Sequence, residues 1–480
     1  MRIAVVGGGI AGLTAAYRLR TLLGDSVRIT VLEAGPHAGG KVRTAELSGL
    51  PVDAGAEAFL VRRPEALDLV DELGLRGRLV HPGGARPRIR AGARTVPLPA
   101  PTVLGIPGSP DVVAEALSPE GRAAVRAENE LPQLAPPRGD VSLGALLRER
   151  FGDELVDRVV DPLLGGVYAG GAEGLGLRAV LPELARQLDA GAGSLTSAAA
   201  ALLPAETARD PVFGTLHGGL SVLVRELATR SAADIRYGEP ASRLRAAPVS
   251  GWRVGLGATG AELEVDGVVL AVPAPVASEL LAEEAGDAAR AFAEVELASM
   301  AVVQLAFPPG TELPDASGVL IATGERHTGG GEFTAKAFTF LSRKWPHYAE
   351  RAPEHGTLVR GSVGRFGDHG SLQAADAELV GRVRADLAEV AGVAAEPAAS
   401  AVYRWNDALP QYGVGHTARV DRIDRAVAGL PGLAVAGAAL RGVGVPACIG
   451  SGDVAAREVA RLLTGGSPAM EDPAGEQGPR

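Results

Sequence analysis

The chain contains 480 residues, of which 46% are hydrophobic and 4% aromatic, and it carries a formal net charge of −10. This length exceeds the size at which a single hydrophobic core stops growing, so we expect two or three domains. The negative charge argues against nucleic acid as a partner, and the only cysteine, Cys448, rules out internal disulfides and multi-cysteine metal sites.

The N-terminal segment has the pattern of a βαβ unit. Residues 3–6 form an apolar run that predicts a buried strand, and residues 13–23 have the apolar spacing of a helix. Residues 27–32 predict a second buried strand. The chain is therefore expected to begin with a nucleotide-binding fold.

Glycines lie between the first strand and the helix, at Gly7, Gly9 and Gly12. This spacing lets the backbone turn tightly and approach a pyrophosphate, to which the N-terminus of the helix presents free amides. Glu33 follows the second strand, where its carboxylate can accept hydrogen bonds from both ribose hydroxyls and disfavours the 2′-phosphate of NADP. These residues predict an adenine dinucleotide, either NAD or FAD.

The region after this unit changes its pattern twice. Residues 64–73 predict a helix, and the Pro-rich residues 86–101 are strand-like, which indicates that the chain leaves the nucleotide domain. Residues 118–203 are helical in pattern, with amphipathic segments at 143–151 and 154–164. We expect a helical subdomain here.

The second half of the chain returns to strands. The apolar run 268–272 suits a strand that rejoins the first sheet, and residues 433–435 predict another buried strand. The further predictions are strands at 301–307, 335–340 and 358–363, a helix at 374–390, a loop at 442–452, a helix at 453–463 and a disordered tail at 465–480. No apolar stretch reaches the roughly 20 residues of a spanning helix, so we expect a cytoplasmic protein with at most peripheral membrane contact.

A second glycine-rich loop decides between NAD and FAD. Gly39 and Gly40 precede Lys41 and the pair Arg43 and Thr44, and Asp53, Gly55 and Glu57 follow. Together with a strand-loop-helix pattern near the C-terminus, this loop resembles the flavin amine oxidase superfamily, in which both chain ends close on one FAD. The resemblance implies FAD rather than NAD.

Separate motifs narrow the resemblance to the oxygen-dependent protoporphyrinogen and coproporphyrinogen III oxidases. Residues 161–170 read Asp-Pro-Leu-Leu-Gly-Gly-Val-Tyr-Ala-Gly, which is similar to a signature of these enzymes. Further matching motifs lie at 105–107, 148–154, 215–220, 405–416 and 442–449. Their number and order indicate a resemblance over nearly the whole chain.

The resemblance implies an α/β fold with three parts. A Rossmann-like FAD-binding domain would comprise residues 1–81, 205–273 and 400–464. An interleaved mixed α+β substrate domain would comprise 82–103 and 274–399, and an inserted helical subdomain 104–204. The tail would begin at residue 465.

The family's cofactor residues carry over position by position, and the resemblance implies non-covalent FAD. The expected cofactor-binding residues are Gly7, Gly8, Gly9, Ile10, Ala11, Gly12, Glu33, Ala34, Gly40, Lys41, Arg43, Gly55, Ala56, Glu57, Ala58, Ala241, Trp405, Val443, Gly444 and Val445. Ala241 stands where the family usually has Val. Cys448, set between apolar residues, is interpreted as a buried structural thiol rather than a covalent flavin attachment.

The implied substrate pocket lies near Gly166, Tyr168 and Gly170, with Arg62 or, preferably, Arg63 binding a propionate. The pyrrole nitrogens of a porphyrinogen can lose protons to water, so no catalytic base is nominated. Asp161, His217 and His416 are interpreted as structural, and no metal is expected.

The implied reaction is oxidation of coproporphyrinogen III to coproporphyrin III, with O2 as acceptor and H2O2 as product, in haem biosynthesis. Protoporphyrinogen IX is the alternative substrate, and a ferrochelatase is the implied partner. Two other classes stay open, namely a flavin oxidase acting on amines or carotenoids, and a non-catalytic flavoprotein scaffold.

Overall fold

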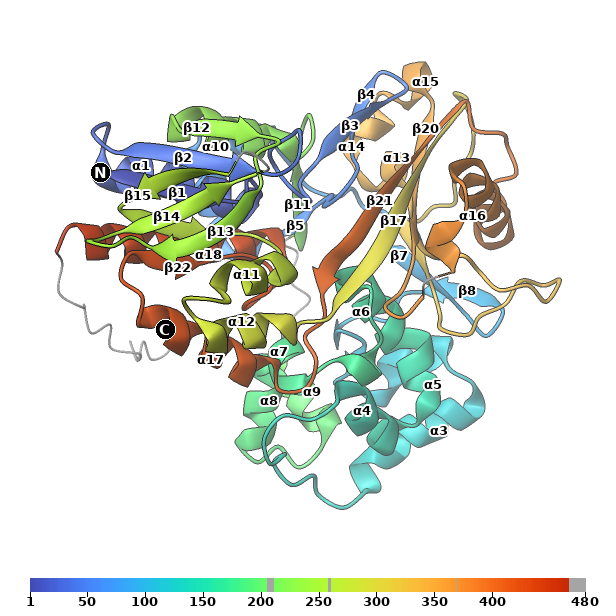
Figure 1. Ribbon diagram of the computed structural model, residues 1–480. Coiled ribbons are helices and arrows are strands. Elements are labelled where there is room, and N and C mark those ends of the chain that lie inside the picture. The colour runs from blue at the N-terminus through green and yellow to red at the C-terminus, as the bar shows by residue number, and fades with distance from the viewer. Residues whose placement is uncertain (205–210, 258–259, 369, 466–480) are drawn as a thin grey trace.

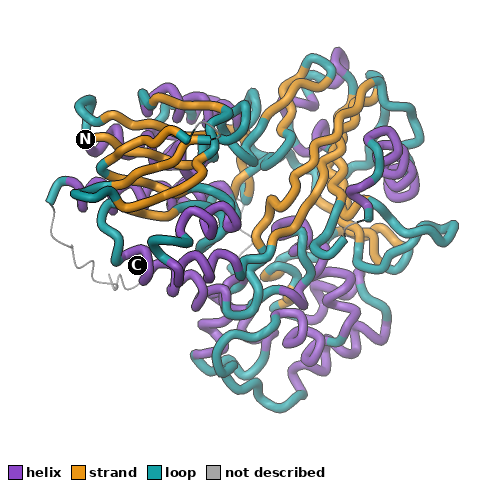
Figure 2. Tube along the Cα trace, in the orientation of Figure 1, coloured by secondary structure: helices purple, strands orange, loops and turns teal. Residues whose placement is uncertain are grey.

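The computed structural model describes residues 1–204, 211–257, 260–368 and 370–465. Two sheets stand side by side, and a group of helices lies below the second sheet in the view of Figures 1 and 2. The predicted disordered tail, 465–480, lies outside the described residues except for Gly465. No helix in the described ranges has the length and apolar character needed to cross a membrane.

The first sheet has five parallel strands in the order β12-β2-β1-β16-β22. Their bounds are β1 Arg2–Val6, β2 Arg28–Glu33, β12 Asp234–Tyr237, β16 Gly267–Leu270 and β22 Leu433–Val435. The predicted βαβ unit and both returning strands are confirmed, because β16 pairs with β1 and β22 pairs with β16. Five distant segments of the chain therefore meet in one sheet.

Helices cover one face of this sheet, and a small antiparallel sheet with further helices covers the other. The first group shares a core and consists of α1 Ile10–Leu23, α2 Pro64–Glu72, α10 Ser221–Ser231 and α18 Val445–Leu463. The second group consists of β13 Ala241–Ala246, β14 Trp252–Leu256, β15 Ala261–Val265, α11 Ala274–Leu281, α12 Gly286–Ala293 and α17 His416–Ala428. Both faces of β1, β2, β16 and β22 are largely buried, as is usual for a parallel sheet, whereas the edge strand β12 is partly exposed.

Helix α18 corrects a prediction. It begins at Val445, so most of the predicted loop 442–452 is already helical. The glycines there serve helix packing rather than a loop: a Cβ at Gly452 would lie 2.2 Å from the Ala11 carbonyl oxygen of α1. Pro446, near the first turn, is at a position where a helix tolerates proline.

The second sheet has seven strands in the order β21-β17-β20-β19-β18-β7-β8. Their bounds are β7 Pro87–Ala91, β8 Arg94–Pro97, β17 Leu297–Phe307, β18 Gly318–Ile321, β19 Ala335–Thr339, β20 Thr357–Val363 and β21 Ala399–Pro410. The predicted boundary at residue 400 would separate β21 from this sheet, whereas β21 pairs with β17 along most of its length. Its backbone hydrogen bonds place β21 with the second sheet.

The two faces of the second sheet differ. Helix α16 (Asp376–Ala391) packs its apolar side against the outer face. The inner face turns toward the hairpin of β3 (Thr44–Leu47) and β4 (Leu50–Asp53) at one end, where Ala306 and Leu358 join its core. At the other end, helix α6 (Asp161–Tyr168) contacts β18 and β19.

The helical group confirms the predicted helical region. Its helices are α3 Pro119–Ala127, α4 Leu143–Phe151, α5 Asp153–Leu155, α6, α7 Leu177–Val180, α8 Pro182–Asp189 and α9 Leu195–Leu202. The segment predicted as one helix at 154–164 differs, because a π-turn at Val156–Val160 joins α5 to α6. Proline at the second position of α6 lacks an amide donor.

Short elements complete the chain. They are β5 Phe59–Leu60, β6 Leu79–Val80, β9 Thr102–Val103, β10 Ile106–Pro107, β11 Phe213–Leu216, α13 Leu341–Lys344, α14 Pro346–Ala349, α15 Ala352–His355, and 3₁₀ turns at Arg76–Arg78, Pro110–Ala116, Glu128–Glu130, Ala172–Gly174 and Ser371–Gln373.

Candidate functional site

The glycine turn has the geometry that its spacing predicted. Gly7 has φ +104°, and a Cβ on Gly7 would lie 2.3 Å from the Ala271 carbonyl oxygen. A Cβ on Gly12 would lie 2.0 Å from the Gly7 carbonyl oxygen, so both positions require glycine. Gly9 differs, because nothing lies within 4 Å of the place where its Cβ would be. The turn thus leaves open space in front of Gly9, at the start of α1.

Glu33 closes the other side of this turn. Its carboxylate accepts hydrogen bonds from the Gly8 amide at 2.8 Å and the Gly35 amide at 2.6 Å. A carboxylate offers about four acceptor sites, so capacity for two hydroxyl donors remains. The segment before Ala241 lies beside Glu33, since the Glu239 amide donates to the Glu33 carbonyl at 3.0 Å, and Ala34 is exposed there.

The second glycine loop contacts the first. The Gly39 amide donates to the Gly8 carbonyl at 2.7 Å, and Gly9 and Gly39 form a parallel bridge. Lys41 follows; burial lowers the pKa of its ammonium, although the nearby Cys448 partly offsets this. Among the described residues Lys41 has no ion-pair partner, so its ammonium is available to a bound anion.

Gly55 brings this loop against Trp405 of β21. A Cβ on Gly55 would lie 2.0 Å from the Lys41 carbonyl oxygen and 3.1 Å from the Trp405 ring. The Trp405 indole donates to the Ala54 carbonyl at 2.9 Å. Arg360 of β20 donates to the carbonyls of Asp53 and Gly55 at 3.3 and 2.8 Å. The second sheet therefore holds the predicted cofactor loop in place.

Asp53 ties the same loop to α10. Its carboxylate accepts hydrogen bonds from the Thr44 hydroxyl at 2.6 Å and from the Leu220 amide at 3.0 Å. Burial raises the pKa of Asp53 to about 7, although both of these donors act in the opposite direction. This carboxylate belongs to the framework of the site.

Two predicted cofactor side chains have partners of their own. Glu57 accepts hydrogen bonds from the Lys344 ammonium and the Trp345 indole, both at 2.8 Å, and lies 3.7 Å from Arg360. Burial raises the pKa of Glu57, but the charges of Lys344 and Arg360 outweigh it and hold the pKa below its usual value. The exposed Arg43 lies 5.8 Å from the ring centroid of Tyr403.

The C-terminal residues reach the site through α18. Val443 and Gly444 directly precede the helix, and Val445 is its first residue, so their amides come before its first internal hydrogen bond. Because Gly452 packs against Ala11, the start of α18 lies beside α1 and the glycine turn. Cys448 is buried, and burial raises the pKa of its thiol to about 11, with Lys41 acting against the rise. A protonated thiol is a poor nucleophile.

The predicted substrate motif meets β21 at its far end. The Gln411 side-chain amide, through Nε2, donates to the Tyr168 carbonyl at 2.7 Å, and a Cβ on Gly170 would collide with the Gln411 side chain at 2.1 Å. The Tyr168 and Tyr412 rings lie 5.6 Å apart, and the Tyr412 hydroxyl accepts a hydrogen bond from the Gly442 amide at 2.7 Å. The motif thus contacts the segment that leads to Val443.

The structure does not connect Arg63 with this motif. Arg63 precedes α2 and pairs with Glu65 at 2.7 Å, with half of its side chain exposed. Within the described part of the chain it makes no hydrogen bond or ion pair to Gly166, Tyr168 or Gly170. Gly166 is exposed on α6.

Of the three residues interpreted as structural, Asp161 and His416 make hydrogen bonds within the fold, and His217 is the exception. Asp161 accepts a hydrogen bond from the Ala172 amide at 2.7 Å, and His416 stacks on Tyr412 while its Nε2 lies 2.7 Å from the Leu440 carbonyl. His217 is exposed and lies 5.6 Å from the His347 ring.

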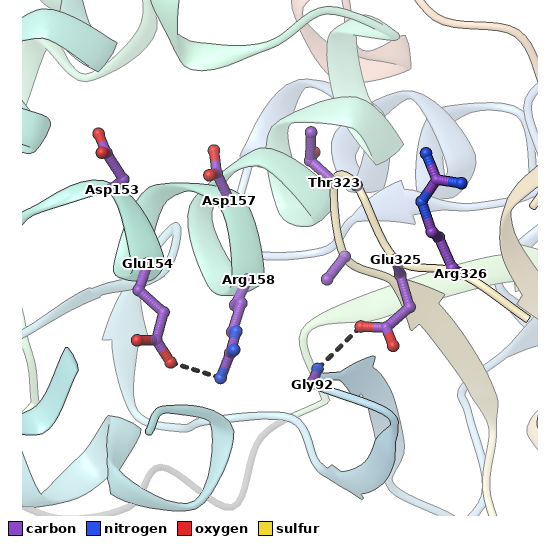
Figure 3. A pocket seen from close by; sticks show the side chains of 10 residues that line it. Gly92, Asp153, Glu154, Asp157, Arg158, Thr323, Glu325 and Arg326 are labelled. Carbon is purple, nitrogen blue, oxygen red and sulfur yellow. Dashed lines mark hydrogen bonds and ion pairs between the residues drawn. The ribbon is translucent and has the colours of Figure 1, made fainter. Parts of the chain in front are cut away.

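A cavity of about 430 Å³ lies away from these residues, between α5 and the loop after β18 (Figure 3). Its charged side chains have partners within the chain: Glu325 accepts a hydrogen bond from the Gly92 amide at 2.8 Å, and Arg158 forms an ion pair with Glu154. The cavity lies between two parts of the chain, and each charged side chain that lines it has a partner among the described residues.

Three basic residues on the inner face and at the end of the second sheet, namely Lys336, Arg360 and Arg365, belong to none of the sequence motifs. One feature of the sequence points to Lys336: the chain has few lysines, and Lys336 lies in a predicted strand whose other residues are mostly apolar. A charged residue in a buried strand is rare unless it has a partner or a ligand.

Comparison with known proteins agrees with this geometry. The model of the flavin containing amine oxidoreductase family matches residues 10–460. Coproporphyrinogen III oxidase of Mycobacterium leprae is 45% identical over 93% of this chain and 95% of its own length. The enzyme of that name from Bacillus subtilis is 31% identical over 96% and 98%. A crystal structure assigned as a protoporphyrinogen oxidase, from Exiguobacterium sp., superposes with a TM-score of 0.83 at 29% identity over 96% of this chain and 98% of the other.

The family match over residues 10–460 covers most of the predicted cofactor site. It includes Glu33, the second loop held by Trp405, and the start of α18. The family implies a flavin cofactor, and the chain belongs to the flavin containing amine oxidoreductase family.

Proposed function

We propose that the chain is an FAD-dependent oxidase that converts coproporphyrinogen III to coproporphyrin III. The observation that carries the proposal is the course of β21. This strand places Trp405 against the cofactor loop, and just beyond its end Gln411 contacts the motif around Tyr168. Relatives that are 44–45% identical over nearly the whole chain are named for this activity.

The residues present fit FAD. The open space at Gly9 suits a pyrophosphate, and Glu33 retains acceptor capacity for ribose hydroxyls. The free amides of Val443 to Val445, at the positive end of a 19-residue helix, suit an electron-rich ring. Cys448 is buried with a raised pKa, which supports non-covalent binding.

The three-part division is part of the proposal. The parallel sheet and its helices would bind FAD, the seven-stranded sheet would line the substrate site, and the helical group would supply the motif around Tyr168. In this division β21 belongs to the substrate domain, because its backbone pairs with β17.

A bound flavin supplies the electron acceptor for removing hydride from the macrocycle. Tyr168 would help to position the substrate, since it is buried and its hydroxyl makes no hydrogen bond to the described residues. Electrons would leave the substrate in successive two-electron steps and reach O2, giving H2O2. A ferrochelatase as the recipient of the product stays a prediction.

Turnover of the two candidate porphyrinogens tests the proposal. Under air, coproporphyrinogen III should give porphyrin fluorescence several-fold faster than protoporphyrinogen IX, with a non-enzymatic control subtracted. A strong preference for protoporphyrinogen IX, the activity to which the Exiguobacterium structure is assigned, would replace the proposed substrate.

Two spectral measurements test the cofactor and the rival classes. The protein denatured by acid should release FAD into the supernatant; FMN or retained colour would contradict the assignment. Anaerobic coproporphyrinogen III should bleach the flavin absorbance, which air restores. No bleaching would favour a scaffold, and bleaching only by amines would favour an amine oxidase.

A further inference from the structure

The inner face of the second sheet carries a buried lysine without a carboxylate partner. Lys336 of β19 is only 5% exposed, and its ammonium donates to the Gly364 carbonyl at 2.7 Å. No described residue forms an ion pair with it. An ammonium has three donors, so two are left over in an interior where an unpaired charge is costly.

Arg365 lies close to this lysine in space, although the two residues belong to different segments of the chain. It follows Gly364, the residue whose carbonyl binds Lys336, and donates to the Ile321 carbonyl at 3.2 Å. Its guanidinium lies 3.3 Å from the place where a Cβ of Gly165 would be, on α6. Among the described residues no carboxylate forms an ion pair with Arg365 either, although Asp161 and Asp368 act on it from a greater distance.

The other two lysines each have an assigned role. Lys344 donates to Glu57 at 2.8 Å and is fully accounted for. Lys41 is also unpaired, but it lies in the proposed cofactor loop. By the same reasoning, the unpaired ammonium of Lys336 indicates a second anion on the side of the substrate.

The position of the pair relative to α6 supports this. The Phe366 amide, next to Arg365, donates to the Ala169 carbonyl at 2.5 Å, which ties the cations to the motif around Tyr168. Phe366, next to the partly buried Arg365, and Val167, next to Tyr168 on α6, are 39% and 42% exposed, so exposed apolar surface lies on the two segments that this hydrogen bond joins. Exposed apolar residues beside positive charge suit an apolar macrocycle that carries carboxylates.

We propose that Lys336 and Arg365 bind a carboxylate of the tetrapyrrole substrate, and that they, rather than Arg63, are its main charge partners. This inference rests on the proposed function. Arg360 stands nearby but is excluded from the role, because it already holds Asp53, Gly55 and Glu57.

The charge state of Lys336 agrees with the proposal. Burial lowers the pKa of its ammonium to about 7, and the positive charges of Arg365 and Arg360 add to this. The groups that surround it are those two arginines from β20 and its end, Asp161 on α6, which acts on Arg365, and Asp386 on α16, which is bound to the Ala335 amide at 2.7 Å. A carboxylate arriving between Lys336 and Arg365 would relieve the repulsion between them.

Binding of coproporphyrin III to the flavin-loaded protein tests the inference without turnover. The porphyrin carries the carboxylates of the proposed substrate, and its fluorescence reports binding. Lys336→Met and Arg365→Met should each weaken binding by about 10- to 100-fold, the range for losing a charged hydrogen bond. Arg326→Met is the control, because this exposed arginine pairs with Glu332 and should bind within twofold of the unsubstituted protein.

Two further readouts separate a binding role from a structural one. The unsubstituted protein should prefer coproporphyrin III to its tetramethyl ester, and the double variant should lose this preference. Lys336→Met should also raise the melting temperature of the protein without porphyrin, because it removes a buried unpaired charge while keeping the volume.

The outcomes distinguish the inference from the function on which it rests. If the unsubstituted protein does not bind coproporphyrin III, the proposed function fails and the inference with it. If it binds and both variants bind equally well, or if only Arg63→Met loses affinity, the inference alone is overturned. A lower melting temperature for Lys336→Met with unchanged affinity would also overturn it.

Discussion

Two acidic side chains of the predicted cofactor site, Glu33 and Asp53, are satisfied by donors within the chain, whereas two basic side chains at the seven-stranded sheet have no carboxylate partner among the described residues. Glu33 accepts two backbone amides, and Asp53 accepts a hydroxyl and an amide. Lys336 and Arg365 donate only to carbonyl oxygens. A charge satisfied within the chain shapes the backbone, while a buried charge left partly unsatisfied indicates that its partner comes from outside.

The largest expected effect is at the glycine turn, where Gly12 is packed within the chain and Gly9 faces open space. In Gly12→Ala the new methyl would overlap the Gly7 carbonyl, so we expect a loss of about 3 kcal/mol in the free energy of unfolding, together with loss of flavin. Gly9→Ala meets no atom of the chain within 4 Å. It should keep the melting temperature of the flavin-free protein and lose flavin affinity alone.

Denaturant unfolding of the flavin-free proteins and flavin titration would measure both effects. If Gly9→Ala bound flavin as tightly as the unsubstituted protein, the open space at Gly9 would not be the cofactor site.

Arg360 and Lys336 form a matched pair on one sheet. Arg360→Met removes hydrogen bonds to the carbonyls of Asp53 and Gly55 and should lower the free energy of unfolding by about 2 kcal/mol. Lys336→Met should change it in the opposite direction. Equal destabilisation by both substitutions, measured by denaturant titration, would remove the distinction between a satisfied and an unsatisfied cation.

The pH dependence of porphyrin binding should report Lys336. Since its pKa is lowered to about 7, the ammonium is charged below pH 7 and loses its proton above it. Affinity for coproporphyrin III should therefore fall by up to about tenfold between pH 6 and 8.5, as a charged hydrogen bond is lost. Lys336→Met should flatten this profile, and a profile unchanged by the substitution would assign the titration to another group.

Trp405 gives the smallest predicted effect. Trp405→Phe removes only the hydrogen bond from the indole to the Ala54 carbonyl, so the free energy of unfolding should fall by about 1 kcal/mol. The flavin spectrum should shift while flavin is retained. An unshifted spectrum would place the indole away from the flavin.

The sequence predicted the parallel sheet well because its signals are local. The glycines of the turn, the apolar strand 3–6 and Glu33 follow one another within a single βαβ unit, and the structure confirms that unit. The predicted helix start at residue 453 was wrong, because Gly450 and Gly452 break the helix pattern in sequence whereas α18 begins at Val445. The reason for them, close packing on α2 and α1, is visible only in three dimensions.

The substrate side was harder to predict for the same physical reason. Lys336, Arg360 and Arg365 come from two neighbouring strands and a turn, and no spacing rule in sequence marks which of them finds a carboxylate. Arg63 was favoured by its place after Phe59 and Leu60, yet its partner is Glu65, two residues away. Whether a basic side chain already has a carboxylate partner, or is free to bind a ligand, can be seen only from contacts in the folded structure.

The contact between α18 and α1 has a consequence for synthesis of the protein. The backbone at Gly452 lies so close to Ala11 that a methyl group would not fit between them, and β22 completes a sheet begun by β1. Helix α1 can pack against α18 only after residues Val445–Leu463 have been synthesised, whereas β1 already has both of its neighbouring strands once β16 has been made. Flavin loading is thus expected to follow translation, and a chain truncated before α18 should emerge colourless.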